Sequence, residues 1–160
     1  MGVYRRLSAR DNLLYFANLY KMNGTKIKQE IDTILDLVGL MDKADALVET
    51  YSKGMIQRLQ IARGLINNPE ILFMDEPTVG LDPVGARMLR DIIRHLKEQG
   101  KTIVLTTHYM YEADELCDRI AIMKQGKIVA LDTPTGLKDY VGGANSLEDA
   151  YIKLVSDSVV

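Results

Sequence analysis

The sequence lacks the features that mark several common classes of protein. Cys117 is the only cysteine, which excludes a disulfide within the chain and favours a reducing compartment. No apolar run approaches the roughly 18 residues of a membrane-spanning helix, and the N-terminal residues have no apolar core typical of a secretory signal. The formal net charge is −2, and no basic stripe indicates a nucleic-acid surface. We therefore expect a cytoplasmic protein that neither inserts into a membrane nor binds nucleic acid.

What is present is an ordinary globular composition. The chain is 47% hydrophobic and 26% charged, as is typical of a soluble domain. Its 160 residues suffice for one domain with a sizeable core and are too few for two ordinary domains.

The first part of the chain is predicted to be helical. Ser8 followed by Asp11 resembles a capping box that opens a helix through residues 12–20. A second helix is indicated by apolar residues at helical spacing from Ile27 to Val38, and Gly39 ends it. A third helix is predicted over Met55–Ile66.

From Ile71 onward the pattern changes to alternating strands and helices. The predicted strands are Ile71–Met74, Thr102–Thr106, Arg119–Met123 and Lys127–Leu131, and the predicted helices are Val84–Gln99, Met110–Cys117 and two short ones capped by Thr133 and Ser146. The first two strands are apolar enough to be buried on both faces, and the last two form a hairpin. The alternation predicts an α/β fold with a parallel sheet covered by helices. We expect a helical subdomain over residues 1–66, a catalytic α/β core over 67–131 and C-terminal helices over 132–160.

Two carboxylates follow the first strand directly. Asp75 and Glu76 stand at the carboxyl end of a buried strand, where open α/β sheets bind ligands. In nucleotide-hydrolysing enzymes of this architecture an Asp there helps to hold Mg²⁺, and an adjacent Glu can act as a general base toward water. The alternative is a pair of solvated acids in a turn.

The next strand ends in a histidine, His108. It therefore lies at the same predicted edge of the sheet, where an imidazole can contact a terminal phosphate. A lone histidine is more often structural or solvated, and we assign His95, in the middle of a helix, to that class. By itself the segment Gly80–Pro83, between the two strands, indicates only a turn.

The segment Tyr51–Met55 precedes a helix directly. A hydroxyl (Ser52) and a glycine (Gly54) at a helix N-terminus can bind an anion, because free backbone N–H groups and the helix dipole face it. The alternative is that Ser52 only caps the helix.

In this order and spacing the segments resemble the ATP-binding domain of ABC transporters, over nearly the whole chain. Tyr51–Met55 is similar to the family signature, Ile71–Asp75 to the Walker B strand, Glu76 to the catalytic glutamate, Gly80–Pro83 to the D-loop and His108 to the switch histidine. The resemblance implies a P-loop NTPase fold of ABC type.

The chain departs from the family pattern in three ways. Lys53 and Met55 replace a glycine and the glutamine of the signature, a form associated with ABC-2 transporters that export drugs, lipids or polysaccharides. Nothing fits the phosphate-binding pattern G-x-x-x-x-G-K-[ST]. In the family the P-loop strand lies between the strand of His108 and Arg119–Met123, so we expect a gap in the sheet and a truncated or split chain that is inactive alone.

The resemblance implies roles for individual residues. Glu76 and His108 are the expected catalytic residues, Asp75 the expected metal ligand, and Ser52, Lys53, Gly54 and Asp82 the expected contacts to ATP. The implied cofactors are ATP and Mg²⁺. The implied partners are a transmembrane permease subunit and a second ATP-binding domain paired head to tail, at the inner face of the cell membrane.

The leading interpretation is therefore the ATP-hydrolysing, energy-coupling subunit of an ABC transporter. One alternative is an ABC-type ATPase of DNA repair, chromosome structure or translation, which the acidic charge balance and the lack of a coiled-coil arm disfavour. The other is a non-catalytic fragment that supplies half of a composite site.

Overall fold

The fold is that of a computed structural model, which describes residues 2–22 and 26–156. Its contacts divide the chain into two compact units, Met1–Thr106 and Thr107–Val160, and each unit is considered by itself. This grouping differs from the three-part division expected from the sequence, which remains a prediction. No helix in the described ranges is both long and apolar enough to cross a membrane.

The first unit begins with a small helical bundle. Its elements are α1 (Ala9–Leu19), α2 (Ile27–Leu37), the 3₁₀ turns η1 (Met41–Lys43) and η2 (Val48–Thr50), and α3 (Lys53–Leu65). The helices pack on one another through side chains that are almost fully buried, including Leu13, Ile31, Leu35, Val38 and Leu59. Burial of such a stripe stabilises helices of this length more than intrinsic propensity does.

Ser8 is the N-cap of α1, at the helix start that the sequence predicts. The Ser8 hydroxyl oxygen accepts a hydrogen bond from the Asp11 N–H at 3.0 Å and donates one to the Asp11 carboxylate at 2.6 Å. Ser8 thus satisfies a backbone donor that the first turn of α1 leaves without a partner.

The end of α2 is fixed by a side chain from α3. The guanidinium of Arg58 donates to the carbonyl oxygens of Val38 at 2.7 Å and Gly39 at 2.8 Å. Gly39 has a φ of 63°, the left-handed geometry that ends helices and that glycine adopts without strain. Burial lowers the pKa of Arg58. This contact ties α3 to the rest of the bundle. The start of α3 lies within Tyr51–Met55, the segment similar to the family signature, which we call the signature turn.

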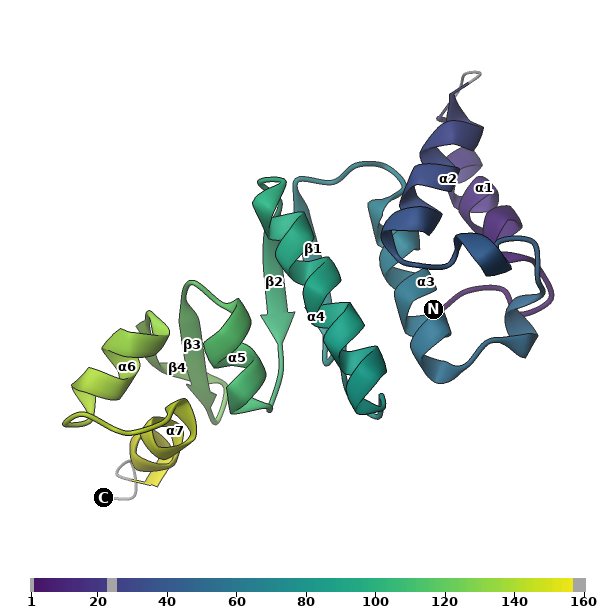
Figure 1. The fold of residues 1–160 in the computed structure, drawn as a ribbon. Helices are drawn as coiled ribbons and strands as arrows, with labels where there is room; N and C mark the ends of the chain where they lie inside the picture. The colour runs from purple at the N-terminus through teal and green to yellow at the C-terminus, as the bar shows by residue number, and fades with distance from the viewer. Residues whose placement is uncertain (1, 23–25, 157–160) are drawn as a thin grey trace. The chain divides into compact units, whose positions relative to one another are not determined.

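After α3 the chain enters a parallel pair of strands. Strand β1 (Ile71–Asp75) pairs with β2 (Thr102–Thr106), so that Ile71 lies opposite Thr102 and Asp75 opposite Thr106. Helix α4 (Pro83–Glu98) connects them and lies across the pair in Figure 1. The predicted order of strand, helix and strand is confirmed.

The expectation that both strands are buried on both faces is wrong. Alternate residues of each strand are exposed, and Phe73 is 76% exposed whereas the neighbouring Met74 is 6% exposed. Both strands have apolar residues suited to burial on both faces, but within the first unit only one face is packed.

The second unit contains a separate antiparallel sheet. It comprises α5 (Met110–Leu116), β3 (Ile120–Lys124), β4 (Lys127–Asp132), α6 (Pro134–Tyr140) and α7 (Leu147–Ser156). Its core is formed by Ala113, Ile122, Leu137 and Leu147. The hairpin turn has positive φ at Gln125 (49°) and Gly126 (75°), as a tight primed turn requires.

Strand β3 forms no ladder with β1 or β2 in the described part of the chain. It pairs with β4 in an antiparallel ladder, so the hairpin predicted from the sequence is confirmed.

The Ser8 cap gives a test of the helical bundle. We expect Ser8→Ala to lower the free energy of unfolding by about 1 kcal/mol, because one N–H of α1 loses its acceptor. Urea unfolding followed by circular dichroism measures the change. The control is Thr33→Ala, which removes an exposed hydroxyl that bonds only its own helix at Gln29 and should change stability by less than about 0.5 kcal/mol. Equal stability of the Ser8 variant and the parent would contradict the assignment.

Candidate functional site

Asp75, the first of the two acids at the carboxyl end of β1, is hydrogen-bonded to a residue of β2. The Thr106 hydroxyl donates a hydrogen bond to the carboxylate of Asp75, and both residues are exposed. The parallel register puts these two residues opposite each other. One carboxylate oxygen is thus oriented by the protein, and the Asp75 side chain stays accessible to a ligand.

Glu76 adopts an unusual backbone conformation. Its φ is 46°, in the left-handed region that costs roughly 1–2 kcal/mol for a residue with a Cβ. Its N–H donates to the Thr106 carbonyl at 3.0 Å and lies 3.3 Å from the Thr106 hydroxyl. The strand pairing therefore holds Glu76 at a bend, where such conformations commonly mark functional positions.

A compact double turn leads from Glu76 to α4. The Val79 N–H donates to the Glu76 carbonyl at 3.2 Å, and the Leu81 N–H donates to the Thr78 carbonyl at 3.1 Å. Asp82 then caps α4, because one oxygen of its carboxylate accepts from the N–H groups of Val84 at 3.0 Å and Gly85 at 2.9 Å. The bond from Gly85 is the main reason that the pKa of Asp82 is lowered.

The signature turn is anchored by Tyr51. This side chain is 7% exposed, and its hydroxyl donates to the Lys43 carbonyl at 2.6 Å. Burial raises its pKa. Ser52 follows as the N-cap of α3, with its hydroxyl oxygen accepting from the Met55 N–H at 3.3 Å. Ser52 is exposed, so the N-terminus of α3 is open to an anion.

The signature turn lies beside the turn before α4. The Lys53 ammonium lies so close to Gly80 that a side chain at Gly80 would displace it, and a Cβ at Gly54 would come 3.8 Å from the Leu81 side chain. Gly80 has a φ of 71°, a second reason for glycine there. The structure thus brings Lys53 and Gly54 together with the segment of Asp82.

The two histidines occupy different surroundings. His108 belongs to the second unit, where its exposed ring lies 4.3 Å from the ring of Tyr109, centroid to centroid. His95 lies on α4 with its Nε2 2.9 Å from the Gln99 amide nitrogen, as suits a structural or solvated histidine. A role for His108 beside Glu76 stays a prediction.

The residues present fit Mg²⁺ and a polyphosphate in chemical type. Asp75 and Thr106 offer oxygen atoms, which Mg²⁺ prefers, and this ion commonly takes one or two protein ligands together with substrate phosphates. Among the described residues no three His, Cys, Asp or Glu side chains gather into a metal cage. Asp75 is therefore suited to a metal ion that also binds phosphate.

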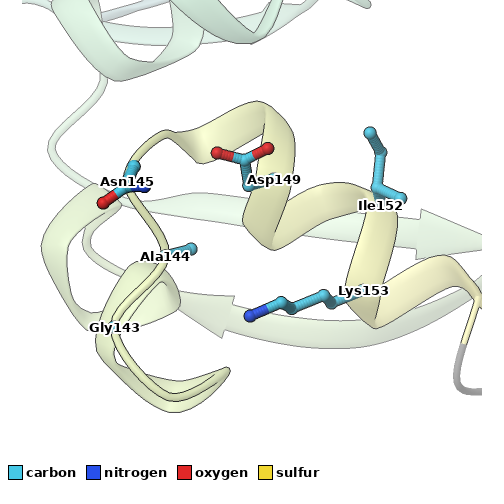
Figure 2. Close-up of a pocket in the computed structure, with 6 residues that line it drawn as sticks. All are labelled: Gly143, Ala144, Asn145, Asp149, Ile152 and Lys153. Atoms are coloured by element: carbon cyan, nitrogen blue, oxygen red, sulfur yellow. The ribbon is translucent and has the colours of Figure 1, made fainter.

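Two surface hollows contain none of the predicted site residues. One, of about 340 Å³, lies between α7 and the loop of residues 143–145 that precedes it, and is shown in Figure 2. Its charged groups serve the local fold: Asp149 bonds the Ser146 hydroxyl at 2.7 Å, and the Lys153 ammonium donates to the Val141 carbonyl at 3.2 Å. The other, of about 390 Å³, lies between the end of α2 and α4, with His95 at its edge.

Sequence reasoning missed three residues that the structure singles out. Thr106 orients Asp75, and Tyr51 anchors the signature turn. Glu112 on α5 is 2% exposed, and its carboxylate oxygens have no hydrogen-bond partner among the described residues. The first two could have been found from their places at a strand end and beside a cap, whereas the helical pattern around Glu112 gives no signal of its burial.

The sequence matches the family model described as ABC transporter over residues 2–79. It is 51% identical over 157 residues to the fluoroquinolones export ATP-binding protein of Mycobacterium tuberculosis, covering 92% of this chain and 51% of that protein. It is 43% identical over 139 residues to the Nod factor export ATP-binding protein I of Rhizobium sp., covering 86% of this chain and 46% of that protein. The chain thus spans about half the length of these curated relatives.

A solved structure described as the ATP-binding subunit of an ABC transporter has the same fold. The TM-score is 0.81 at 26% sequence identity, and the match covers 95% of this chain and 64% of that chain. Almost every described element thus has a counterpart there, whereas a substantial part of the solved chain has none here.

The Asp82 cap predicts a pH dependence of stability. Because the folded-state pKa lies below the unfolded value, ionised Asp82 stabilises the fold above the unfolded pKa, and this contribution is lost as the pH falls through the folded pKa. Asp82→Asn keeps a capping oxygen and should reduce the acid sensitivity of the urea midpoint between pH 7 and pH 2. The control is Asp42→Asn on η1, an exposed aspartate, which should keep the parental profile. An unchanged profile for Asp82→Asn would contradict the assignment.

Proposed function

Because this chain belongs to the ATP-binding domains of ABC transporters, we propose that it is part of the energy-coupling subunit of an export transporter. In this role ATP binding and hydrolysis at Asp75, Glu76 and the signature turn drive transport through a separate permease. The M. tuberculosis and Rhizobium relatives are export proteins by name, which supports export as the direction of transport.

The observation that carries the proposal is the arrangement at the end of β1. Asp75 is oriented by Thr106 and remains exposed, and Glu76 is held at a strained bend by the same residue. One strand end therefore presents two carboxylates with different surroundings, which suits a division between metal binding and base catalysis.

Asp75 is the proposed metal ligand. Bound Mg²⁺ with ATP supplies the terminal phosphoryl group and neutralises part of its charge. The protein's part is to hold the Asp75 carboxylate in place before the ligand arrives, and the hydrogen bond from Thr106 does this from the neighbouring strand.

Glu76 is the proposed general base. A carboxylate in this position can accept a proton from an attacking water. The hydrogen bond from the Glu76 N–H to the Thr106 carbonyl fixes the backbone that carries this side chain. We further propose that His108, at the start of the second unit, contacts the terminal phosphate through its ring N–H.

The signature turn is proposed to close over ATP held by a second domain. Ser52, Lys53 and Gly54 supply a hydroxyl, an ammonium and a backbone N–H at the open N-terminus of α3. All three favour an anion. Asp82 is proposed to contribute at the same interface, from a position that its cap on α4 keeps fixed.

The proposed partners are a transmembrane permease and a second ATP-binding domain paired head to tail. We propose a location on the cytoplasmic side of the membrane, bound to the permease. The 160 residues contain no G-x-x-x-x-G-K-[ST] pattern. The proposed active ATPase therefore requires a phosphate-binding loop that lies outside these residues. The chain alone is proposed to be inactive.

Neither alternative from the sequence is retained as the main function. An ATPase of DNA repair or translation is disfavoured, because the M. tuberculosis and Rhizobium relatives are both export proteins by name. The half-site interpretation remains compatible with the proposal, because a signature turn can complete a site on another domain.

The base assignment is tested in a domain completed with the P-loop segment of the M. tuberculosis relative. Glu76→Gln should retain ATP binding and reduce turnover by about 10²–10⁴-fold, because the general base is lost. Asp75→Asn should instead weaken Mg²⁺-dependent ATP binding, measured by calorimetry. The matched control is Asp91→Asn on the exposed side of α4, which should leave both properties unchanged. Turnover at the parental rate in Glu76→Gln would refute its role.

The signature turn is tested by mixing. The chain alone should show no ATP turnover, whereas added to an intact homologous domain whose own signature serine is replaced by arginine it should restore activity. Ser52→Arg in this chain should abolish the rescue, because the bulky cation blocks the helix N-terminus. Ser146→Arg, at a cap in the second unit, is the control for a general effect of arginine. No rescue by a chain shown to be folded would refute the half-site.

A further inference from the structure

The lysine of the signature turn reaches a second turn of the first unit. Lys53 stands where the family signature usually has a glycine, so the chain has a long cationic side chain there. If Gly80 carried a Cβ, that atom would lie 3.3 Å from the Lys53 Cε and 3.8 Å from its Cδ, and it would overlap the Nζ. The end of the lysine side chain therefore lies along Gly80, with the ammonium in the place that a side chain at Gly80 would fill.

Gly80 is constrained in two separate ways. Its φ of 71° is a conformation that glycine adopts without strain, and the place of its missing side chain is taken by the Lys53 ammonium. Gly100, after α4, shares only the first constraint, since its φ is 81° and a Cβ there would have no neighbour within 4 Å. The two glycines therefore allow the effect of backbone strain to be separated from the effect on Lys53.

The charge of Lys53 is not offset by the fold of the first unit. Its ammonium forms no hydrogen bond or ion pair with another described residue of that unit. Asp82, two residues after Gly80, caps α4 instead, through hydrogen bonds from the N–H groups of Val84 and Gly85. Because the ammonium has no carboxylate partner there, its charge is available to an external anion.

The position of Lys53 also conflicts with the stability of its own helix. Lys53 is the first residue of α3, and the first turn of that helix holds no acidic residue. The N-terminal end of a helix carries a partial positive charge, so an acid there is favourable and a cation is unfavourable. Helix stability thus does not explain this lysine. Residues that break a local rule in this way are expected at functional sites.

We propose that Gly80 is a positioning residue that acts through Lys53. Because Gly80 has no side chain, the Lys53 ammonium can lie in the place that a Cβ would fill, and from there it meets the terminal phosphate presented to the signature turn. This inference rests on the proposed function, since that phosphate belongs to ATP held by a second domain. To the proposed contacts of Ser52 and Gly54 it adds a full positive charge, which attracts a triphosphate more strongly than a diphosphate.

The placement of the charge depends on Gly80. A lysine side chain loses rotamer freedom when it binds an anion, and that loss is smaller when the side chain is already held against a turn. A side chain at position 80 would displace the ammonium, so that the charge would remain but would no longer be placed. Loss of the space at Gly80 and loss of the Lys53 charge should therefore have the same effect on phosphate binding.

The test is binding of inorganic triphosphate by the purified 160-residue chain, followed by the amide signals of residues 52–54 and 80 in nitrogen-15 NMR spectra. Lys53→Met should weaken binding about tenfold, as loss of a hydrogen bond to a charged group does, and should reduce the salt dependence of binding. Gly80→Ala should weaken binding by a similar factor. The variant with both changes should bind no more weakly than Lys53→Met alone, because two residues that act through one contact are not additive.

Control variants separate the placement of the charge from other effects, and circular dichroism establishes that each variant is folded. Gly100→Ala introduces alanine at a similar positive φ with no neighbour to displace, and it should keep the parental affinity. Lys28→Met removes an exposed positive charge from α2 and should also keep it. Lys53→Arg retains the charge and should recover most of the affinity that Lys53→Met loses. Gly80→Asn carries a Cβ but tolerates the left-handed conformation better than alanine does, so it replaces Gly80→Ala if that variant does not fold.

Three results would overturn the proposal. Parental affinity for triphosphate in Lys53→Met, or no binding by the parent chain, would show that the ammonium does not meet a phosphate. A further loss of affinity when Gly80→Ala is added to Lys53→Met would show that Gly80 acts through its own backbone and independently of the lysine.

The mixing experiment on the signature turn keeps this inference distinct from the proposed function. In that assay Lys53→Met should raise the KM for ATP about tenfold and change kcat little, because the contact to ATP is made before the reaction as well as during it. Triphosphate binding that depends on Lys53 and Gly80 without any rescue would leave the positioning of Lys53 intact and refute the proposed half-site. Rescue by Lys53→Met with a parental KM would do the reverse.

Discussion

The parallel pairing of β1 with β2 is the constraint on which most of the candidate site depends. It places Thr106 beside Asp75, and through that one residue it orients the Asp75 carboxylate and fixes the backbone of Glu76 in its left-handed conformation. The backbone bond to Thr106 and the turn that follows offset the local cost of that conformation. A shift of the register by one residue would turn Asp75 to the packed face, so the position of the acids is inseparable from the packing behind them.

The same pairing explains why the chain carries both a packed and a bare surface. Alternation along a strand sends successive side chains to opposite faces, and the apolar residues at Ile71, Phe73 and Val104 are suited to burial on the side that no other described element of the first unit packs. Ile71 and Phe73 alternate with the packed residues in the same way as Asp75 does. The exposed apolar side chains and the candidate site are therefore parts of one surface of the first unit.

Much of the fold could be predicted because its signals are local. Ser8, Gly39, Pro83 and Thr133 mark helix ends through capping chemistry that depends on a few neighbouring residues. The burial of β1 could not be predicted in this way, because exposure depends on segments distant in the sequence. The strained backbone of Glu76 and the tie from Arg58 to the end of α2 also escape local reasoning, since each depends on a partner about 20 or more residues away.

The candidate site shows the same division between local and distant causes. The residue types at Asp75, Glu76 and Ser52 indicate their chemistry by position relative to a strand end or a helix start. The contact of Lys53 with Gly80 follows only from how α3 packs against the segment before α4. A lysine in place of the usual signature glycine thus has a structural consequence within this chain, since its ammonium lies beside Gly80, in the turn that leads to a second predicted ATP contact, Asp82. A side chain at Gly80 would displace Lys53 and alter the charge presented at the N-terminus of α3, so the two turns are coupled within the proposed phosphate site.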